Sequence, residues 1–309
     1  MMRIELCLVL GGVMLAQPLA GQNDGREATS LLGRPLVRPV LAGETLARLE
    51  AQLAAARAAY ERSPDNADSI IWLGRRTAYL GRYREAIQIF AEGIAKHPND
   101  ARLYRHRGHR YITIRELDHA IQDLERAAAL ERGREDEIEP DGAPNRFNIP
   151  TSTLQSNIWY HLGLAHYLKH DFAKALPAWL EAMKVSNNDD MLVATSDWLY
   201  MTYRRLGRAR DAEQVLTRIT PDLRILENEA YHKRLLMYKG LLKPDAVLDF
   251  NNPDPVQVAT YGYGVGNWYL AQGDSARAFA LFDKILEGRN WAAFGFIAAE
   301  AEIAARAKQ

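Results

Sequence analysis

The feature that most constrains this chain is a motif that returns every 34 residues. Ala86 and Ala120 are 34 residues apart, and so are Gly74 and Gly108. A fixed period of this size is typical of one supersecondary unit stacked on copies of itself, and not of a globular enzyme with a closed core. The sequence therefore predicts a stack of similar units, each about one period long.

The first clear unit, residues 67–100, contains Leu73-Gly74, the segment from Tyr79 to Ala86, and then Phe90. It resembles the tetratricopeptide repeat (TPR), a pair of antiparallel helices. Further units begin near residues 101, 156, 193 and 259, with a degenerate fifth unit around 246. The resemblance covers residues 43–309. It implies an all-α, right-handed superhelix of about six helix pairs, with glycines at tight helix crossings and alanines 86, 120, 175, 212 and 278 buried.

Covering elements are predicted at both ends of the repeats, because terminal repeats leave an apolar face without a neighbour. Residues 44–62 read as an amphipathic helix and form an N-terminal half-repeat cap. Residues 290–305 read as a closing helix. Residues 22–42 are polar and punctuated by prolines, so we predict a flexible lead-in there.

The N-terminus reads as a secretory signal peptide over residues 1–21. Arg3 precedes an apolar run from Leu6 to Ala16, and Ala20 and Gly21 offer small residues for cleavage. An uncleaved anchor is the alternative, but the apolar run is too short to cross a bilayer comfortably. We therefore expect export to a bacterial periplasm or cell surface and no transmembrane span after cleavage. The cleaved product would carry no thiol, since Cys7 is the only cysteine.

One insertion breaks the period at residues 131–150. Its first part is acidic, and Pro140, Pro144 and Pro150 argue against a helix. Long irregular connections in repeat proteins are often functional, although a solvated, tolerated loop is the alternative. Because this insertion follows an arginine-rich helix, we hypothesise that residues 131–141 partly cover the groove around Arg102 and Arg105.

Composition and motifs give no indication of catalysis. The net charge is zero, so broad attraction to nucleic acid is not expected. The chain shows no nucleophile elbow, zinc-protease helix or paired carboxylates. His166 and His170 share a helix face but lack an evident third ligand. We therefore expect no catalytic residues, no metal and no cofactor.

The resemblance implies that the first helix of each pair lines a concave groove, at the second, fifth and ninth residues of each unit. Arginine suits the groove of a binding module because its fork can bond both oxygens of a carboxylate. The predicted function is a non-catalytic scaffold for a protein or peptide, and an acidic partner would match the arginines. A solvated arginine face is the alternative. The predicted groove residues are Arg75, Arg102, Arg105, His109, Asn157, Tyr160, Tyr263 and Asn267.

A second function class remains open at this point. An enzyme or small-ligand receptor could hold its pocket near Tyr263, Gly264 and Asn267, or under the 131–150 insertion. The three glycines of 262–266 follow no strand and lack the spacing of a phosphate loop, and Gly264 has no packing role in the repeat. A long open groove would favour peptide binding, whereas a closed pocket with convergent polar groups would favour a ligand site.

Overall fold

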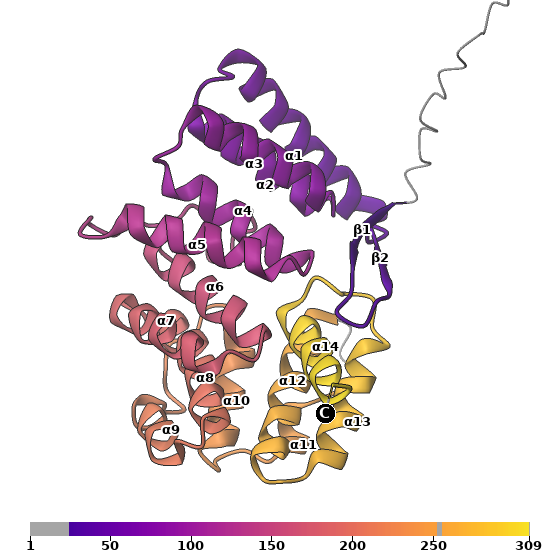
Figure 1. Cartoon of the computed structure of the whole chain (residues 1–309), viewed down its shortest axis with the longest axis vertical. Helices are drawn as coiled ribbons and strands as arrows, with labels where there is room; N and C mark the ends of the chain where they lie inside the picture. The colour runs from indigo at the N-terminus through magenta and orange to yellow at the C-terminus, as the bar shows by residue number, and fades with distance from the viewer. Residues whose placement is uncertain (1–24, 252–254, 309) are drawn as a thin grey trace, which may run out of the picture.

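The protein is a stack of antiparallel helix pairs in a computed structural model that describes residues 25–251 and 255–308. Figure 1 shows the pairs following one another along a curve, from the N-terminal arm to the C-terminal one. The all-α repeat architecture predicted from the sequence is confirmed. The predicted signal peptide, residues 1–21, lies outside the described residues.

The helix bounds follow the predicted units closely. The cap helix α1 spans Gly43–Arg62, and the closing helix α14 spans Phe294–Arg306. Within the described residues, the six pairs between them are α2 (Ala67–Tyr79) with α3 (Tyr83–Lys96), α4 (Ala101–Thr113) with α5 (Leu117–Glu131), α6 (Leu154–Leu168) with α7 (Phe172–Val185), α8 (Asp189–Arg205) with α9 (Ala209–Val215) and its extension η1 (Leu216–Arg218), α10 (Glu229–Tyr238) with α11 (Pro244–Val247), and α12 (Pro255–Ala271) with α13 (Ser275–Leu286).

Glycine lets the two helices of a pair approach closely. A Cβ atom added to Gly74 would lie 2.4 Å from the Phe90 ring, and one added to Gly163 would lie 2.6 Å from Trp179. Gly108 and Gly266 make the same close approach, so all four predicted crossings are confirmed. The alanines at 86, 120, 175, 212 and 278 are fully buried, as predicted. Close packing of small and large side chains therefore fixes the geometry of each pair.

The predicted flexible lead-in is in fact a β-hairpin. Strands β1 (Arg26–Thr29) and β2 (Pro35–Val37) pair antiparallel. The Trp291 indole donates to the Val37 carbonyl oxygen at 2.8 Å, and Glu27 accepts the backbone N–H of Arg84 at 3.1 Å. These bonds hold the hairpin to both arms of the molecule, and Figure 1 shows the hairpin lying between the two arms. The composition of residues 22–42 did not predict this hairpin, because the groups that hold it lie in distant parts of the sequence.

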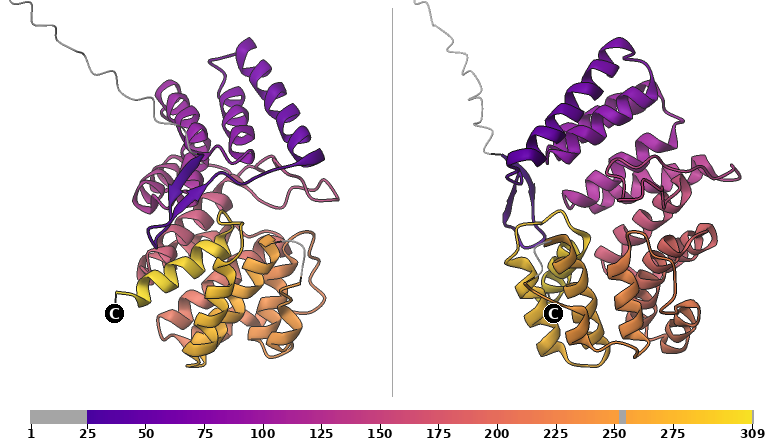
Figure 2. Two further views of the ribbon diagram at one scale, coloured as in Figure 1. Left: turned by 90° about the vertical axis from the view of Figure 1, so that its right-hand side faces the viewer. Right: turned by 180° about the vertical axis from the view of Figure 1, so that it is seen from behind.

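The closing helix α14 turns inward toward the concave side of the stack. It packs on α12 and α13 and also contacts α6. Its first residue, Phe294, places its ring 5.4 Å from His109 and 5.6 Å from His161. The views of Figure 2 show the hairpin joining the first helices to this C-terminal arm. None of the described helices is long and apolar enough to cross a membrane.

Candidate functional site

A cavity of about 250 Å³ lies between α2, α4, α6 and the connection from α5 to α6. Arg75 of α2, Arg105 and His109 of α4, and Asn157 of α6 all line it, so half of the predicted groove residues meet there. Helical phase explains this convergence, because each residue lies on the inner face of the first helix of its pair. Residues that the sequence did not single out as a site also line this cavity: His106, Arg110, Glu139, Asp141 and His161.

The insertion, which follows α5, forms a roof over this cavity through Glu139, Asp141 and Gly142, whereas most of its other residues are exposed. It pairs with the segment just before α6, since the backbone N–H of Glu139 donates to the Ser152 carbonyl oxygen at 3.1 Å. Arg76 of α2 donates to the Gly142 carbonyl oxygen at 2.7 Å. A Cβ atom on Gly142 would lie 1.9 Å from the Tyr79 hydroxyl, so only glycine allows this approach. The insertion is therefore fastened across the first two repeats.

One ion pair joins the roof to the groove. Glu139 Oε2 lies 2.9 Å from Arg105 Nε, and both side chains are less than 10% exposed. The predicted contact between the acidic insertion and Arg105 is therefore present in the structure. Arg102 differs, because its guanidinium is paired with Asp68 and Asp100 and lines a neighbouring cavity of about 200 Å³.

The ion pair is close but poorly aligned. Neither Arg105 Nε nor Glu139 Oε2 makes a hydrogen bond of acceptable geometry with any described residue. A buried charge-assisted contact is strong only when donor and acceptor are aligned. Arg105 therefore keeps donor capacity that a better-placed acceptor could use.

The cavity carries an excess of positive charge. Arg75, Arg105 and Arg110 face Glu139 and Asp141, so three cations oppose two carboxylates, leaving one positive charge when both acids are ionised. Burial lowers the pKa of Arg110 to about 10 and raises the pKa of Asp141. Both shifts show how poorly water reaches these groups.

The three histidines of the cavity are held neutral. Burial lowers the pKa of His106, His109 and His161 well below the ordinary value, and neighbouring arginines lower it further. Neutral imidazole has one donor and one acceptor nitrogen, and the neighbours decide which is which. These rings therefore act as directional polar groups and not as charges.

Hydrogen bonds fix two of these rings in opposite tautomers. Arg105 can only donate, so His106 Nδ1, 2.9 Å away, is an acceptor and Nε2 carries the proton. In His161, Nδ1 lies 2.6 Å from the Asn157 carbonyl oxygen and must donate, which leaves Nε2 as the acceptor. Asn157 thus orients His161, and its amide also donates to Ser152 of the roof at 2.9 Å.

Tyr160 belongs to the wall between α6, α8 and α10. Its hydroxyl accepts the Trp198 indole N–H at 2.6 Å and lies 2.9 Å from the Tyr231 hydroxyl. The ring stands edge-on to Trp179. The Tyr160 hydroxyl therefore forms its hydrogen bonds with other side chains of the protein.

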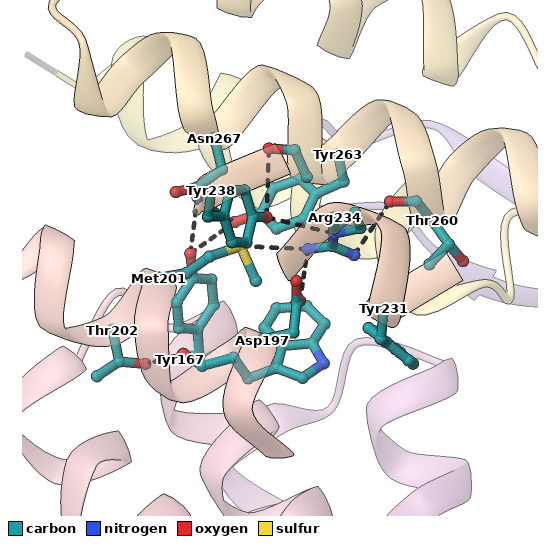
Figure 3. Close-up of polar contacts among 12 residues, drawn as sticks. Tyr167, Asp197, Met201, Thr202, Tyr231, Arg234, Tyr238, Thr260, Tyr263 and Asn267 are labelled. Carbon is teal, nitrogen blue, oxygen red and sulfur yellow. Dashed lines mark hydrogen bonds and ion pairs between the residues drawn. The ribbon is translucent and has the colours of Figure 1, made fainter. Parts of the chain in front are cut away.

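Tyr263 and Asn267 do not line a groove, contrary to the prediction. Their side chains are 0% and 2% exposed. Asn267 donates to the Tyr167 hydroxyl at 2.8 Å (Figure 3), and the Tyr263 hydroxyl lies 3.1 Å from a Glu302 carboxylate oxygen. Tyr167 of α6 therefore takes up the amide of Asn267, and Glu302 of α14 lies against Tyr263, where helical phase alone predicted an open groove.

Gly264, which the sequence left without a role, makes room for a buried cation. A Cβ atom there would lie 1.9 Å from Arg234 Nε. The guanidinium of Arg234 lies 2.7 Å from Asp197, as Figure 3 shows, and both side chains are almost fully buried. The predicted alternative ligand position near Tyr263 is thus filled by a network of protein side chains.

Comparison with known proteins finds no matching family model and no matching curated protein. Similar solved structures include YrrB, described as a TPR protein with an unusual peptide-binding site, at 16% identity over 83% of this chain and 98% of that one, with a TM-score of 0.44. A TPR protein from Parabacteroides merdae is 15% identical over 83% of this chain and 93% of its own, with a TM-score of 0.47. MamA is 17% identical over 65% of this chain and 97% of its own, with a TM-score of 0.43.

Proposed function

We propose that the protein is a non-catalytic binding scaffold that takes a carboxylate group of a protein or peptide into the cavity beneath the insertion. The observation that carries this proposal is the Arg105–Glu139 pair. Glu139 is a carboxylate supplied by the chain itself, held against an arginine in a groove position. This contact supports a carboxylate as the group that the surface accepts, and Glu139 would hold the place that an acidic side chain of a partner takes.

Charge supports an acidic partner. A further carboxylate would meet the positive charge that remains when Glu139 and Asp141 are both counted. Arginine in a poorly hydrated site binds carboxylates more strongly than it does in water. A mobile partner must compete with Glu139, which is tethered beside the site and therefore present at high effective concentration. Binding is thus coupled to movement of the roof.

The position of α14 limits where a partner can lie. Phe294 lies against His109 and His161, and Glu302 lies against Tyr263. A partner that extended along the whole concave face would have to displace α14. The proposed contact is therefore confined to the N-terminal half, at α2, α4 and α6.

A small-ligand receptor is the second candidate, favoured by the cavity itself. The space beneath the roof brings together arginines, carboxylates and three histidines with strongly lowered pKa. Convergent polar groups with perturbed titration are typical of ligand sites. Both candidates use the same carboxylate-binding arginine, so one experiment serves both.

The test is calorimetric binding of a blocked tetraglutamate peptide, with tetraglutamine as the control peptide. Glu139→Gln should tighten tetraglutamate binding about tenfold at low ionic strength, because the internal competitor loses its charge. Glu135 is exposed in the same segment, so Glu135→Gln makes the same charge change away from Arg105 and should leave affinity unchanged.

Arg105→Gln, shown to be folded by circular dichroism, should lose the binding. The proposal is overturned if Glu139→Gln binds no better than Glu135→Gln, or if folded Arg105→Gln binds as well as the natural protein. Tetraglutamine binding as tightly as tetraglutamate would overturn it too.

We further propose that the scaffold works in an exported compartment, on the strength of the apolar run from Leu6 to Ala16 that follows Arg3. Mature protein from a bacterial envelope fraction should begin between residues 17 and 23. N-terminal sequencing that still reads Met1 would count against export by cleavage.

A further inference from the structure

The cavity beneath the insertion contains two buried acceptors with nothing to accept from. His161 Nε2 and Asp141 Oδ2 have no hydrogen-bond partner among the described residues, although both side chains line the cavity. Buried polar atoms are almost always paired, and an orphan costs free energy unless something else supplies the partner. Each of these two atoms can therefore accept a hydrogen bond from a donor outside the protein.

The acceptor role of His161 is fixed by geometry. Its Nδ1 donates to the Asn157 carbonyl oxygen at 2.6 Å, and the residue is only 4% exposed. The neutral ring can then only accept at Nε2. Protonation of the ring is opposed by Arg105 and Arg110 in the same cavity.

Helix α4 offers donors to the same cavity. Arg105 has a buried Nε–H without an aligned partner, and His106 presents its Nε2 proton 4.0 Å from Glu139. The cavity is thus bipolar: donors suited to a carboxylate lie on α4, and unsatisfied acceptors lie at His161 and on the roof. A simple anion would satisfy only the first set.

We infer that the ligand of this cavity is a small amino- or hydroxy-carboxylic acid whose carboxylate meets Arg105. An ammonium group on this acid donates to both His161 Nε2 and Asp141 Oδ2, whereas a hydroxyl group donates to one of them. This inference rests on the proposed recognition of a carboxylate by this cavity. The volume of about 250 Å³ suits a molecule of that size. The surplus positive charge favours an acid with two carboxylates and one ammonium or hydroxyl group.

The test compares three acids with the same carbon chain: glutamate, 2-hydroxyglutarate and glutarate. They carry an ammonium, a hydroxyl or only hydrogen at carbon 2. Calorimetry on the full chain should show glutamate and 2-hydroxyglutarate binding at least about tenfold more tightly than glutarate, since only these two can donate to an unpaired acceptor.

Variants of the two acceptors sharpen the test. His161→Phe should weaken glutamate binding toward that of glutarate and leave glutarate binding unchanged. Asp141→Asn should reduce the ratio of glutamate to glutarate affinity, because the neutral amide attracts the ammonium group less and repels the carboxylates less. His166 is on the same helix, is also buried and does not line the cavity. His166→Phe is therefore the matched control and should preserve the preference for glutamate.

Two different failures can be told apart. If glutarate binds as tightly as glutamate, or if tetraglutamate binds and none of the three acids does, this inference is wrong and carboxylate recognition stands. If neither the acids nor tetraglutamate bind, the proposed function fails and this inference fails with it.

Discussion

Arg115 donates to Glu300 at 2.8 Å across 185 residues of sequence. The side chains are 3% and 1% exposed. The pair joins the turn between α4 and α5 to the closing helix α14. Arg115 also donates to the Trp291 carbonyl oxygen at 2.8 Å, so one guanidinium fastens both the helix and the loop that precedes it.

Arg115→Ala should lower the free energy of unfolding by about 3–5 kcal/mol, because it leaves the buried charge of Glu300 unpaired. Urea denaturation at pH 7 measures this loss. Arg208 forms an exposed pair with Asp211, so Arg208→Ala is the control and should change the midpoint little. Equal midpoints for the two variants would show that the buried pair does not stabilise the closure.

Gly264→Ala should be destabilising by about 3 kcal/mol or more, because the new methyl group displaces Arg234 and separates it from Asp197. Gly262→Ala is the matched control on the same helix. It meets only the flexible end of Ile285 at 3.0 Å, and it gains up to about 1 kcal/mol of helix propensity. Similar melting temperatures for the two variants would contradict the role assigned to Gly264.

Ala120→Leu should overpack the α4–α5 pair and lower the free energy of unfolding by about 1–3 kcal/mol. Ala120 is fully buried, whereas Ala55 is exposed on α1. Ala55→Leu introduces the same side chain at the surface and should have little effect in the same urea titration. A common midpoint would argue against the helix register.

Stability should fall as the pH is lowered below about 6.5. His106, His109 and His161 have strongly lowered pKa through burial, so the folded protein binds fewer protons than the unfolded chain in this range. The stability that these neutral histidines contribute is fully present above the pKa of histidine in the unfolded chain. It is lost as the pH falls toward their lower pKa in the folded protein. Each histidine can remove up to about 1.4 kcal/mol per pH unit.

Urea titrations at pH 7.5 and 5.5 test this dependence. His161→Gln should lessen the loss of stability between the two pH values. His119 is 62% exposed, and His119→Gln serves as its control. A loss of stability that is the same in His161→Gln and in the natural protein would rule out this contribution from His161.

The helix stack could be predicted because the residues that pack each helix pair are close in sequence and recur in every unit. A glycine and a bulky residue 16 positions later, such as Gly74 with Phe90 and Gly163 with Trp179, bring two consecutive helices together. The hairpin could not be predicted in this way. Its strands are four and three residues long, and its fastening groups, such as Trp291, lie at the other end of the sequence.

The site was predictable where helical phase and charge sufficed. Phase placed Arg105 and His109 on the inner face, and the acidic insertion beside the arginines pointed to the contact with Glu139. His161 could have been found, because it lies one helical turn after Asn157. Helical phase also selected Tyr263 of α12. Helical phase within α12 cannot show that α14, which comes later in the sequence, packs on that face of α12.

The hairpin at one end of the chain and α14 at the other are joined, through the bond from Trp291 to Val37. An open array of repeats can fray from either end, and its neighbouring units melt almost independently. Here fraying at one terminus must also break contacts made by the other. The molecule should therefore unfold as one cooperative unit, with amide protons of the outermost helices exchanging no faster than those of the middle of the array.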